Sequence, residues 1–275
     1  MLIMKIFSWN NIIDFLNTGV QNDFFTNGVG ISVGCFDGIH KGHRVLLNTL
    51  VSECKRSNLK AGVVTFTRPL PSLKHSSDYC WDISSLETRI KLFEDLGIDF
   101  IIVVDFDDEF SSQLGADFLN ILVNACNMEL LAEGVDFRCG YKGATDAQAI
   151  KYFGEKNNIK TIFVEPVYYN ENTEEEERIS SSYIRGMVNK GFFSTVTELL
   201  NRPYDIDISN CEQEIKNKKI YIARTSLIQA LPPNGVYRVS DENNNELRLK
   251  ISDNHLSIES IDRDCTKLSR IIFNK

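Results

Sequence analysis

The chain has 275 residues, 43% of them hydrophobic and 25% charged, and a formal net charge of −8 at pH 7. This composition is typical of a globular protein that can bury a full core, and the acidic balance argues against a general nucleic-acid binder. Its seven cysteines are odd in number and form no CxxC pair, so neither a zinc site nor a disulfide framework is indicated.

The N-terminal segment, residues 1–16, is apolar but is interrupted by Lys5, Ser8 and Asp14. It lacks the continuous apolar core and small-residue cleavage site of a signal peptide, and no later segment approaches a membrane span. We therefore expect a cytoplasmic protein that does not cross a membrane.

Short apolar runs alternate with helical patterns through most of the chain. The runs predict buried strands at 30–33, 61–66, 100–104, 129–133 and 161–164. Apolar residues at helical spacing predict helices over 43–55, 85–96, 115–125 and 147–153. This alternation predicts a parallel sheet covered on both faces, with ligands at the carboxyl ends of its strands.

The pattern changes near Pro203. Short alternating stretches separated by polar turns follow at 220–222, 236–239, 247–251, 256–258 and 271–273. They predict a small antiparallel β unit. We therefore divide the chain into an α/β domain over residues 1–204 and a β domain over residues 205–275.

The segment richest in chemical information is residues 34–43, Gly-Cys-Phe-Asp-Gly-Ile-His-Lys-Gly-His. Glycines let the backbone approach a polyphosphate, and a helix N-terminus offers unpaired N–H groups to it. Spaced by three, His40 and His43 share a helix face and are expected to donate hydrogen bonds to charge developing at the α-phosphorus of a nucleotide. The expected phosphate-binding residues are Gly34, Phe36, Asp37, Gly38 and Gly42. The alternative is a pair of surface histidines after a tight turn.

A second phosphate-binding element is expected at residues 180–182, three serines where a helix begins. Arg178 and Arg185 flank them and would neutralise a polyphosphate. Without the histidine segment, the serines would be read as an ordinary helix cap and the arginines as surface charges. The acidic run at 174–177 is predicted to be a solvated loop.

The HxGH element is the signature of a nucleotidyltransferase superfamily, and the Phe-Asp-Gly before it resembles the bacterial FAD synthetases. These are the adenylyltransferase part of the bifunctional riboflavin kinase/FMN adenylyltransferases. The resemblance continues, in the order of the family, through residues 86–99, 104–110, 134–140 and 178–185. It covers about residues 25 to 205.

The resemblance implies a Rossmann-like nucleotidyltransferase domain with a parallel sheet, followed by a small antiparallel β C-terminal domain. It implies ATP and FMN as substrates, FAD and pyrophosphate as products, and Mg²⁺ bridging the ATP phosphates. No residue is assigned as a metal ligand. The implied catalytic residues are His40, His43, Arg178, Ser181 and Arg185, with Ser180 and Ser182 binding phosphate. The implied flavin- or nucleotide-binding residues are Asp136, Phe137, Phe66 and Arg68.

The chain departs from the family pattern at several places, including Cys139 and Thr145, and two of the departures bear on function. The family's T-F-x-P-H-P motif reads Thr-Phe-Thr-Arg-Pro-Leu-Pro at 65–71, so its histidine is absent. Arg68 is the candidate substitute as a phosphate ligand, whereas His75 lies too far along to be assumed one. The riboflavin kinase domain is replaced by about seventy residues that lack the family's G-[FY]-P-T-A-N loop. We therefore expect residues 205–275 to be a relic without kinase activity.

Two other functions remain open from the sequence. One is an adenylyltransferase with a different acceptor, such as nicotinamide mononucleotide, phosphopantetheine or a sugar-alcohol phosphate. The other is a non-catalytic sensor of flavin or nucleotide. The sequence does not indicate an oligomeric state.

Overall fold

A computed structural model describes residues 4–19, 22–68, 81–260 and 267–274. Two compact units make up the chain, and neither is one continuous stretch. The first comprises residues 1–36, 42–76 and 90–168, and the second comprises residues 37–41, 77–89 and 169–275. The chain passes from the first unit to the second and back within the segment that carries His40 and His43.

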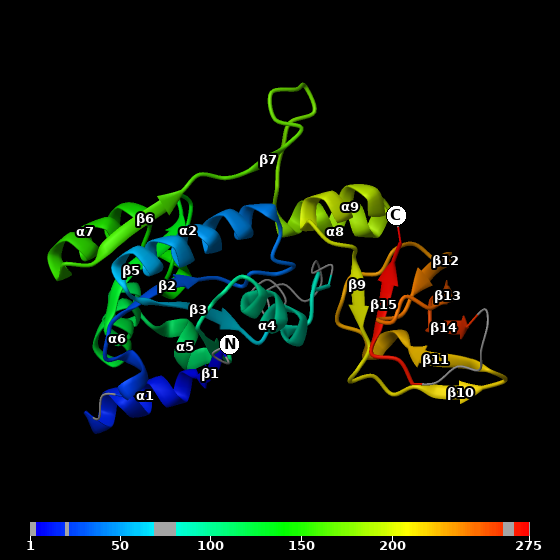
Figure 1. Cartoon of the computed structure of the whole chain (residues 1–275), viewed down its shortest axis with the longest axis horizontal. Coiled ribbons are helices and arrows are strands. Elements are labelled where there is room, and N and C mark those ends of the chain that lie inside the picture. Colours follow the sequence, from blue (N-terminus) through cyan, green and yellow to red (C-terminus); the bar gives the residue numbers. More distant parts are fainter. Residues whose placement is uncertain (1–3, 20–21, 69–80, 261–266, 275) are drawn as a thin grey trace. The chain divides into compact units, whose positions relative to one another are not determined.

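The first unit is built on a six-stranded parallel sheet with the order β1-β4-β3-β2-β5-β6 (Figure 1). Its strands are β1 (Lys5–Ser8), β2 (Val29–Val33), β3 (Lys60–Phe66), β4 (Phe100–Val104), β5 (Met128–Gly134) and β6 (Lys160–Val164). From β2 the chain builds outward through β3 and β4 on one side, and later through β5 and β6 on the other. The gap between β2 and β5 is therefore the switch point, where ligands bind in sheets of this kind.

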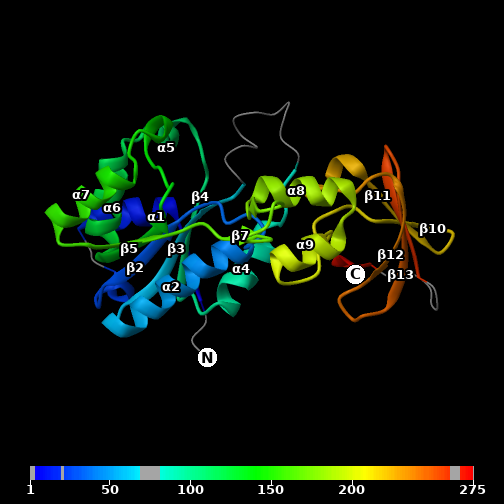
Figure 2. The same ribbon diagram turned by 90° about the horizontal axis from the view of Figure 1, so that it is seen from above.

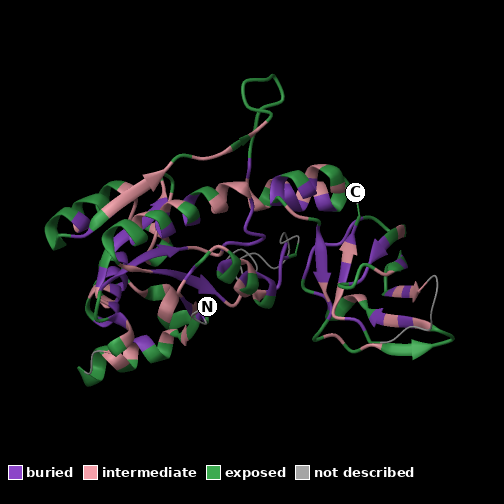
Figure 3. Cartoon of the chain, in the orientation of Figure 1, coloured by how far each residue is buried: buried purple, intermediate pink, exposed green. Residues whose placement is uncertain are grey.

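Helices cover both faces of this sheet (Figure 2). They are α1 (Trp9–Thr18), α2 (Lys41–Ser57), α4 (Leu86–Asp95), α5 (Asp108–Ser112), α6 (Gly115–Cys126) and α7 (Ala147–Asn157), with short 3₁₀ turns at Asp23–Phe25 and Tyr141–Gly143. Ile12, Phe118 and Ile150 bring α1, α6 and α7 into one core with β2, β3 and β4. On the other face Leu50 and Cys54 of α2 lie against Gly30, where a Cβ would meet the Cys54 sulfur at 2.3 Å. Figure 3 shows the central strands largely buried.

The predicted parallel sheet and its predicted strands are confirmed, with ends that differ by at most a residue. The predicted helices are also present, although α2 begins two residues earlier and α7 runs four residues further. Strand β1 and helix α1 were not predicted. Ser8 begins α1 through a capping box with Asn11, and Gly19 ends it in a left-handed conformation with φ of 65°.

The second unit combines two helices with an antiparallel sheet of order β10-β11-β14-β13-β12-β15-β9. Its helices are α8 (Ser181–Lys190) and α9 (Phe193–Leu200), with a 3₁₀ turn at Arg224–Ser226. Its strands are β9 (Asp205–Asp207), β10 (Glu214–Lys216), β11 (Lys219–Ala223), β12 (Gly235–Ser240), β13 (Glu246–Ile251), β14 (His255–Ser260) and β15 (Arg270–Phe273). A two-stranded ladder pairs β7 (Tyr168–Tyr169) with β8 (Glu177–Arg178).

Aromatic packing joins the helices of the second unit to its sheet. The rings of Phe193 and Phe273 stack with centroids 4.3 Å apart, and Tyr204 donates a 2.6 Å hydrogen bond to the Ala230 carbonyl. The five C-terminal strands predicted from alternation are all present, and the predicted antiparallel β unit is confirmed. In the described part of the chain no helix has both the length and the apolar character needed to cross a bilayer.

Candidate active site

His40 immediately precedes α2, and His43 lies in the first turn of that helix. The His40 side chain is buried, and burial together with the positive charge of Arg178 lowers its pKa to about 4. His40 is therefore a neutral imidazole at pH 7, able to donate one N–H. Arg178 is exposed on β8. The acidic run 174–177 is exposed as predicted and lies in a loop except for Glu177, which begins β8.

Asp37 anchors the loop before these histidines. Its buried carboxylate accepts backbone N–H groups from Ile83 at 2.9 and 3.0 Å and from Ser84 at 3.1 Å, and lies 3.6 Å from Nη1 of Arg185. Burial is the main cause that raises the Asp37 pKa to about 6, with Asp82 adding to it, while the N–H groups and Arg185 oppose the rise. The carboxylate already binds groups of the protein itself, so a phosphate contact from Asp37 would have to come from its backbone.

The serine element meets the same loop within the second unit. Ser180 caps α8 by accepting the Tyr183 N–H at 3.2 Å, which confirms that the three serines begin a helix. Ser181 donates its hydroxyl to the Asp37 carbonyl at 3.1 Å, and Arg185 donates to the Ser182 hydroxyl at 3.3 Å. One polar cluster therefore combines residues that are far apart in the sequence: 37–38, 181–182 and 185.

Gly38 occupies a position that only glycine fits without strain. Its N–H donates to the Ser84 hydroxyl at 2.8 Å, its φ is 80°, and a Cβ there would lie 2.8 Å from Cγ2 of Ile83. We expect Gly38→Ala to lower the free energy of unfolding by about 2–4 kcal/mol, from backbone strain plus overpacking.

Urea denaturation measures this loss, and Gly191→Ala is the matched control. Gly191 has a similar φ of 76°, but its added Cβ would meet only Pro233, at 3.7 Å. The control therefore carries the backbone cost without the clash. Equal losses in the two variants would contradict the close packing of Gly38 against Ile83.

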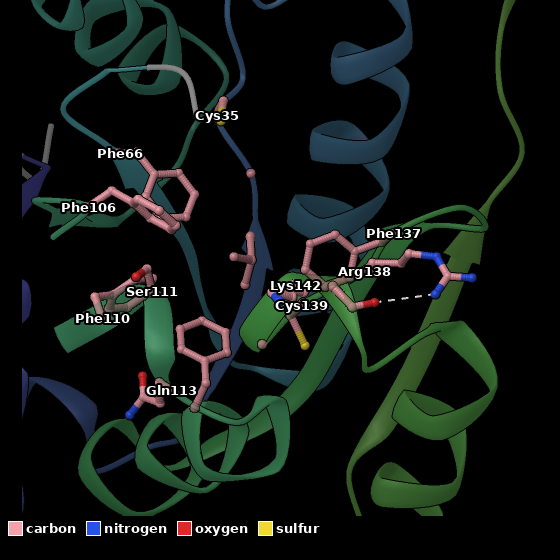
Figure 4. Close-up of a pocket in the computed structure, with 15 residues that line it drawn as sticks. Cys35, Phe66, Phe106, Phe110, Ser111, Gln113, Phe137, Arg138, Cys139 and Lys142 are labelled. Carbon is pink, nitrogen blue, oxygen red and sulfur yellow. Dashed lines mark hydrogen bonds between the residues drawn. The ribbon is translucent and has the colours of Figure 1, made fainter. Parts of the chain in front are cut away.

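The first unit contains a cavity of about 330 Å³ at the switch point. Figure 4 shows Phe66, Phe106 and Phe110 on one side of it and Phe137, Cys139 and Lys142 on the other. The Phe66 ring lies 5.8 and 5.9 Å from those of Phe106 and Phe110. The remaining lining residues are Val33, Gly34, Cys35, Ser111, Gln113, Phe118, Arg138, Gly140 and Gly143.

These walls suit a flat aromatic ligand, because aromatic side chains stack on such rings and exclude water from them. Phe66 and Phe137 were predicted as flavin-binding residues, and both line the cavity. Sequence reasoning did not single out Phe106, Phe110 and Phe118 as lining residues. Phe106 and Phe110 could have been noticed in the sequence as two phenylalanines four residues apart shortly after a predicted strand.

Three other predicted residues do not line the cavity. Asp136 is exposed in the turn after β5 and does not line the cavity, and Arg68 is half-buried two residues beyond β3. Phe36 is buried, with its ring edge-on to His43 at 5.2 Å, so its side chain supports that histidine. Gly42 lies in the first turn of α2. The remainder of the altered motif, 69–71, and His75 lie outside the described residues.

Residues 24–183 match the family model described as FAD synthetase, which is more than half of the chain. The chain belongs to the FAD synthetase family. The predicted family resemblance is confirmed, and it covers β2 to β6, both histidines, the aromatic cavity and the three serines.

Curated members of the family differ in how much of their length this chain spans. It is 29% identical over 214 residues to a bifunctional riboflavin kinase/FMN adenylyltransferase of Buchnera aphidicola subsp. Schizaphis graminum, covering 76% of this chain and 67% of the relative. The enzyme of the same description from Bacillus subtilis is 28% identical over 234 residues, covering 79% and 68%. The chain thus spans about two thirds of these bifunctional relatives. A FAD synthetase of Listeria monocytogenes is 23% identical, covering 81% of this chain and 87% of that protein.

A crystal structure of a protein from Streptococcus pneumoniae, described as a macrolide-efflux protein, superimposes with a TM-score of 0.75. The match covers 98% of both chains at 19% sequence identity. This similarity shows a shared fold that includes the C-terminal antiparallel sheet.

Proposed function

We propose that this protein is an FMN adenylyltransferase, which makes FAD and pyrophosphate from FMN and ATP. The observation that carries the proposal is a single segment of chain. Residues 33–35, at the end of β2, line the aromatic cavity, and the same segment continues to His43 in the first turn of α2. If a flavin ring occupies the cavity, the residues that come next along the chain are suited to bind its phosphate and ATP.

The reaction needs no covalent enzyme intermediate. A terminal phosphate oxygen of FMN attacks the α-phosphorus of ATP, a new P–O bond forms, and the bond to the leaving pyrophosphate breaks. Catalysis is then positioning and stabilisation of charge. His40 and His43 would donate hydrogen bonds to the developing charge, and the amides at the start of α2 would add their dipoles.

The polar cluster of the second unit would hold the polyphosphate. The backbone N–H groups at the start of α8, including that of Ser181, would offer donors, and Arg178 and Arg185 would supply positive charge. Gly34, Gly38 and Gly42 would let the backbone approach the phosphates. Arg68 would replace the missing histidine of the altered motif as a phosphate ligand, and Asp136 would contact flavin or nucleotide from the turn after β5.

Mg²⁺ would accompany ATP by bridging its phosphates and would reduce their charge. Among the described residues, no group of three or more His, Cys, Asp or Glu side chains could hold a metal ion. Hard divalent cations that bind through substrate phosphates need few protein ligands, so an ion brought with ATP would not require such a group.

The aromatic cavity would bind the isoalloxazine ring of FMN. We expect Phe137→Ala to weaken FMN binding by about tenfold, because it removes one aromatic wall and the stacking that goes with it. Titration of flavin fluorescence measures the effect, with Phe192→Ala at an exposed position of the second unit as control. Unchanged FMN affinity in Phe137→Ala would exclude this wall from the flavin site.

We further propose that the protein acts in the cytoplasm and that residues 205–275 have no riboflavin kinase activity. Residues 205–275 contain no G-[FY]-P-T-A-N loop, which supports the absence of kinase activity in this segment.

One experiment tests the proposed function. The purified protein is incubated with ATP, Mg²⁺ and either FMN or riboflavin, and the flavins are separated by chromatography. We expect FAD from FMN and no FMN from riboflavin. FMN formed from riboflavin would refute the monofunctional assignment. Pyrophosphate released only with another phosphate acceptor would show that the acceptor is not FMN. Binding of FMN and ATP without release of pyrophosphate would identify a sensor.

A further inference from the structure

Strands β2 and β5 part at the switch point before either strand ends. Their pairing runs from Val29 opposite Met128 to Ile31 opposite Leu131 and stops there. Strand β2 continues to Val33, and β5 continues to Gly134 in its ladder with β6. The backbone groups of β2 that would face β5 beyond Ile31 therefore need other partners.

Glu133 provides one of them. The backbone N–H of Val33 donates to Oε1 of Glu133 at 2.6 Å. On the opposite side of β2, the N–H of Gly34 donates to the Val64 carbonyl of β3 at 3.0 Å. A side-chain oxygen from β5 thus takes the place that a backbone carbonyl of β5 would hold in a continued ladder.

The Glu133 side chain is enclosed by the protein at this place. It is 1% exposed, and burial raises its pKa well above the usual range, which favours the neutral carboxyl group over the charged one. A neutral carboxyl group can bridge the two strands without the large cost of a buried charge.

The bridge joins two strands whose carboxyl ends lead into the lining of the aromatic cavity. Val33 and Gly34 line the cavity from β2, and Phe137 and Cys139 line it from the segment after β5. Glu133 lies close enough to Cys139 to help burial raise the pKa of that thiol to about 12. The Glu133–Val33 hydrogen bond therefore links β2 to β5 next to residues that line the cavity.

We propose that Glu133 is a positioning residue of the flavin site: it spans the split between β2 and β5 and holds the cavity at the width of a planar ring. The proposal rests on the proposed function, since it takes FMN as the occupant of the cavity. Glu133 acts through Val33 and need not touch the substrate.

Steady-state kinetics with FMN and ATP varied separately tests the proposal. Glu133→Leu keeps the volume but leaves the Val33 N–H without its acceptor, and we expect the KM for FMN to rise about tenfold. The kcat at saturating FMN and the KM for ATP should stay within about twofold. Glu133→Gln keeps the acceptor oxygen and the length of the side chain, and should restore the KM for FMN to within about threefold. Glu129→Leu, at an exposed position of the same strand, is the matched control.

Each outcome decides the matter. An unchanged KM for FMN in Glu133→Leu, or an equal loss in both KM values and kcat, overturns the positioning role. If Glu133→Leu does not fold, Glu133→Asp replaces it, because its shorter side chain cannot span the same gap, and an unchanged KM for FMN again overturns the role. A wild-type protein that neither binds FMN nor forms FAD overturns the proposed function itself, and this inference with it.

Discussion

Replacing His43 with alanine is expected to slow FAD formation by about a hundredfold, which is the usual cost of losing one preorganised donor to a transition state. His43 lies in the first turn of α2, where the helix dipole favours negative charge, and the Phe36 ring packs edge-on against it at 5.2 Å. The effect should fall on kcat, because the charge that His43 meets develops during the reaction. Pyrophosphate release at saturating FMN and ATP measures it.

His255→Ala is the matched control for this variant. His255 is exposed on β14, in the C-terminal sheet, and its removal should leave the rate unchanged. Thermal unfolding of both variants shows whether the fold is retained. Turnover close to wild type in a folded His43→Ala protein would remove His43 from the catalytic residues.

Replacing Asp37 with asparagine is expected to lower kcat/KM for ATP by about tenfold or more. The substitution removes the charge that faces Arg185 at 3.6 Å and leaves one oxygen where two accept the N–H of Ile83. Arg185 and the loop that leads to His40 then lose a common anchor. Asp95→Asn, at an exposed position of α4, should leave kcat/KM unchanged. Wild-type kcat/KM for ATP in Asp37→Asn would show that the anchor is dispensable.

The same variant should change how stability depends on pH. The Asp37 pKa is raised from 3.8 to about 6, so the carboxyl group stabilises the fold fully below about pH 4 and loses that contribution as the pH rises through 6. A shift of about two pKa units corresponds to about 3 kcal/mol. We therefore expect the stability of the wild type relative to Asp37→Asn to fall by up to this amount between pH 4 and 6.

His40 opposes this trend in the wild type. Its pKa is lowered from 6.5 to about 4, so its contribution is present above pH 6.5 and is lost as the pH falls toward 4. Comparing the wild type with Asp37→Asn cancels the His40 part, because both proteins retain that residue. Urea unfolding at pH 4, 5, 6 and 7 measures the difference. A difference that stays constant over this range would show that Asp37 has an ordinary pKa in the fold.

Most of the fold could be predicted from local pattern. Apolar runs such as residues 100–104 are strands because both their faces are buried, and residues 115–126 form a helix because its apolar side faces the sheet. Strand β1 and helix α1 were not predicted, although Trp9, Ile12 and Leu16 recur at helical spacing and the capping box at Ser8 and the glycine at 19 mark the helix ends. The predicted motifs at His40, His43 and Ser180–Ser182 lie at helix starts, as expected.

The sequence by itself determined the family, the parallel sheet, the antiparallel C-terminal strands and the helix starts near His43 and at Ser181, because periodicity and short motifs record which residues are buried and where helices begin. Only the tertiary structure decided which residues those elements contact. Asp37 finds its partners at Ile83, Ser84 and Arg185, and the aromatic cavity gathers Phe66, Phe106 and Phe137 from different strand ends. Glu133 bridges to Val33, one hundred residues away in sequence. Such contacts depend on which strands are neighbours and where their pairing stops, and local spacing carries no record of either.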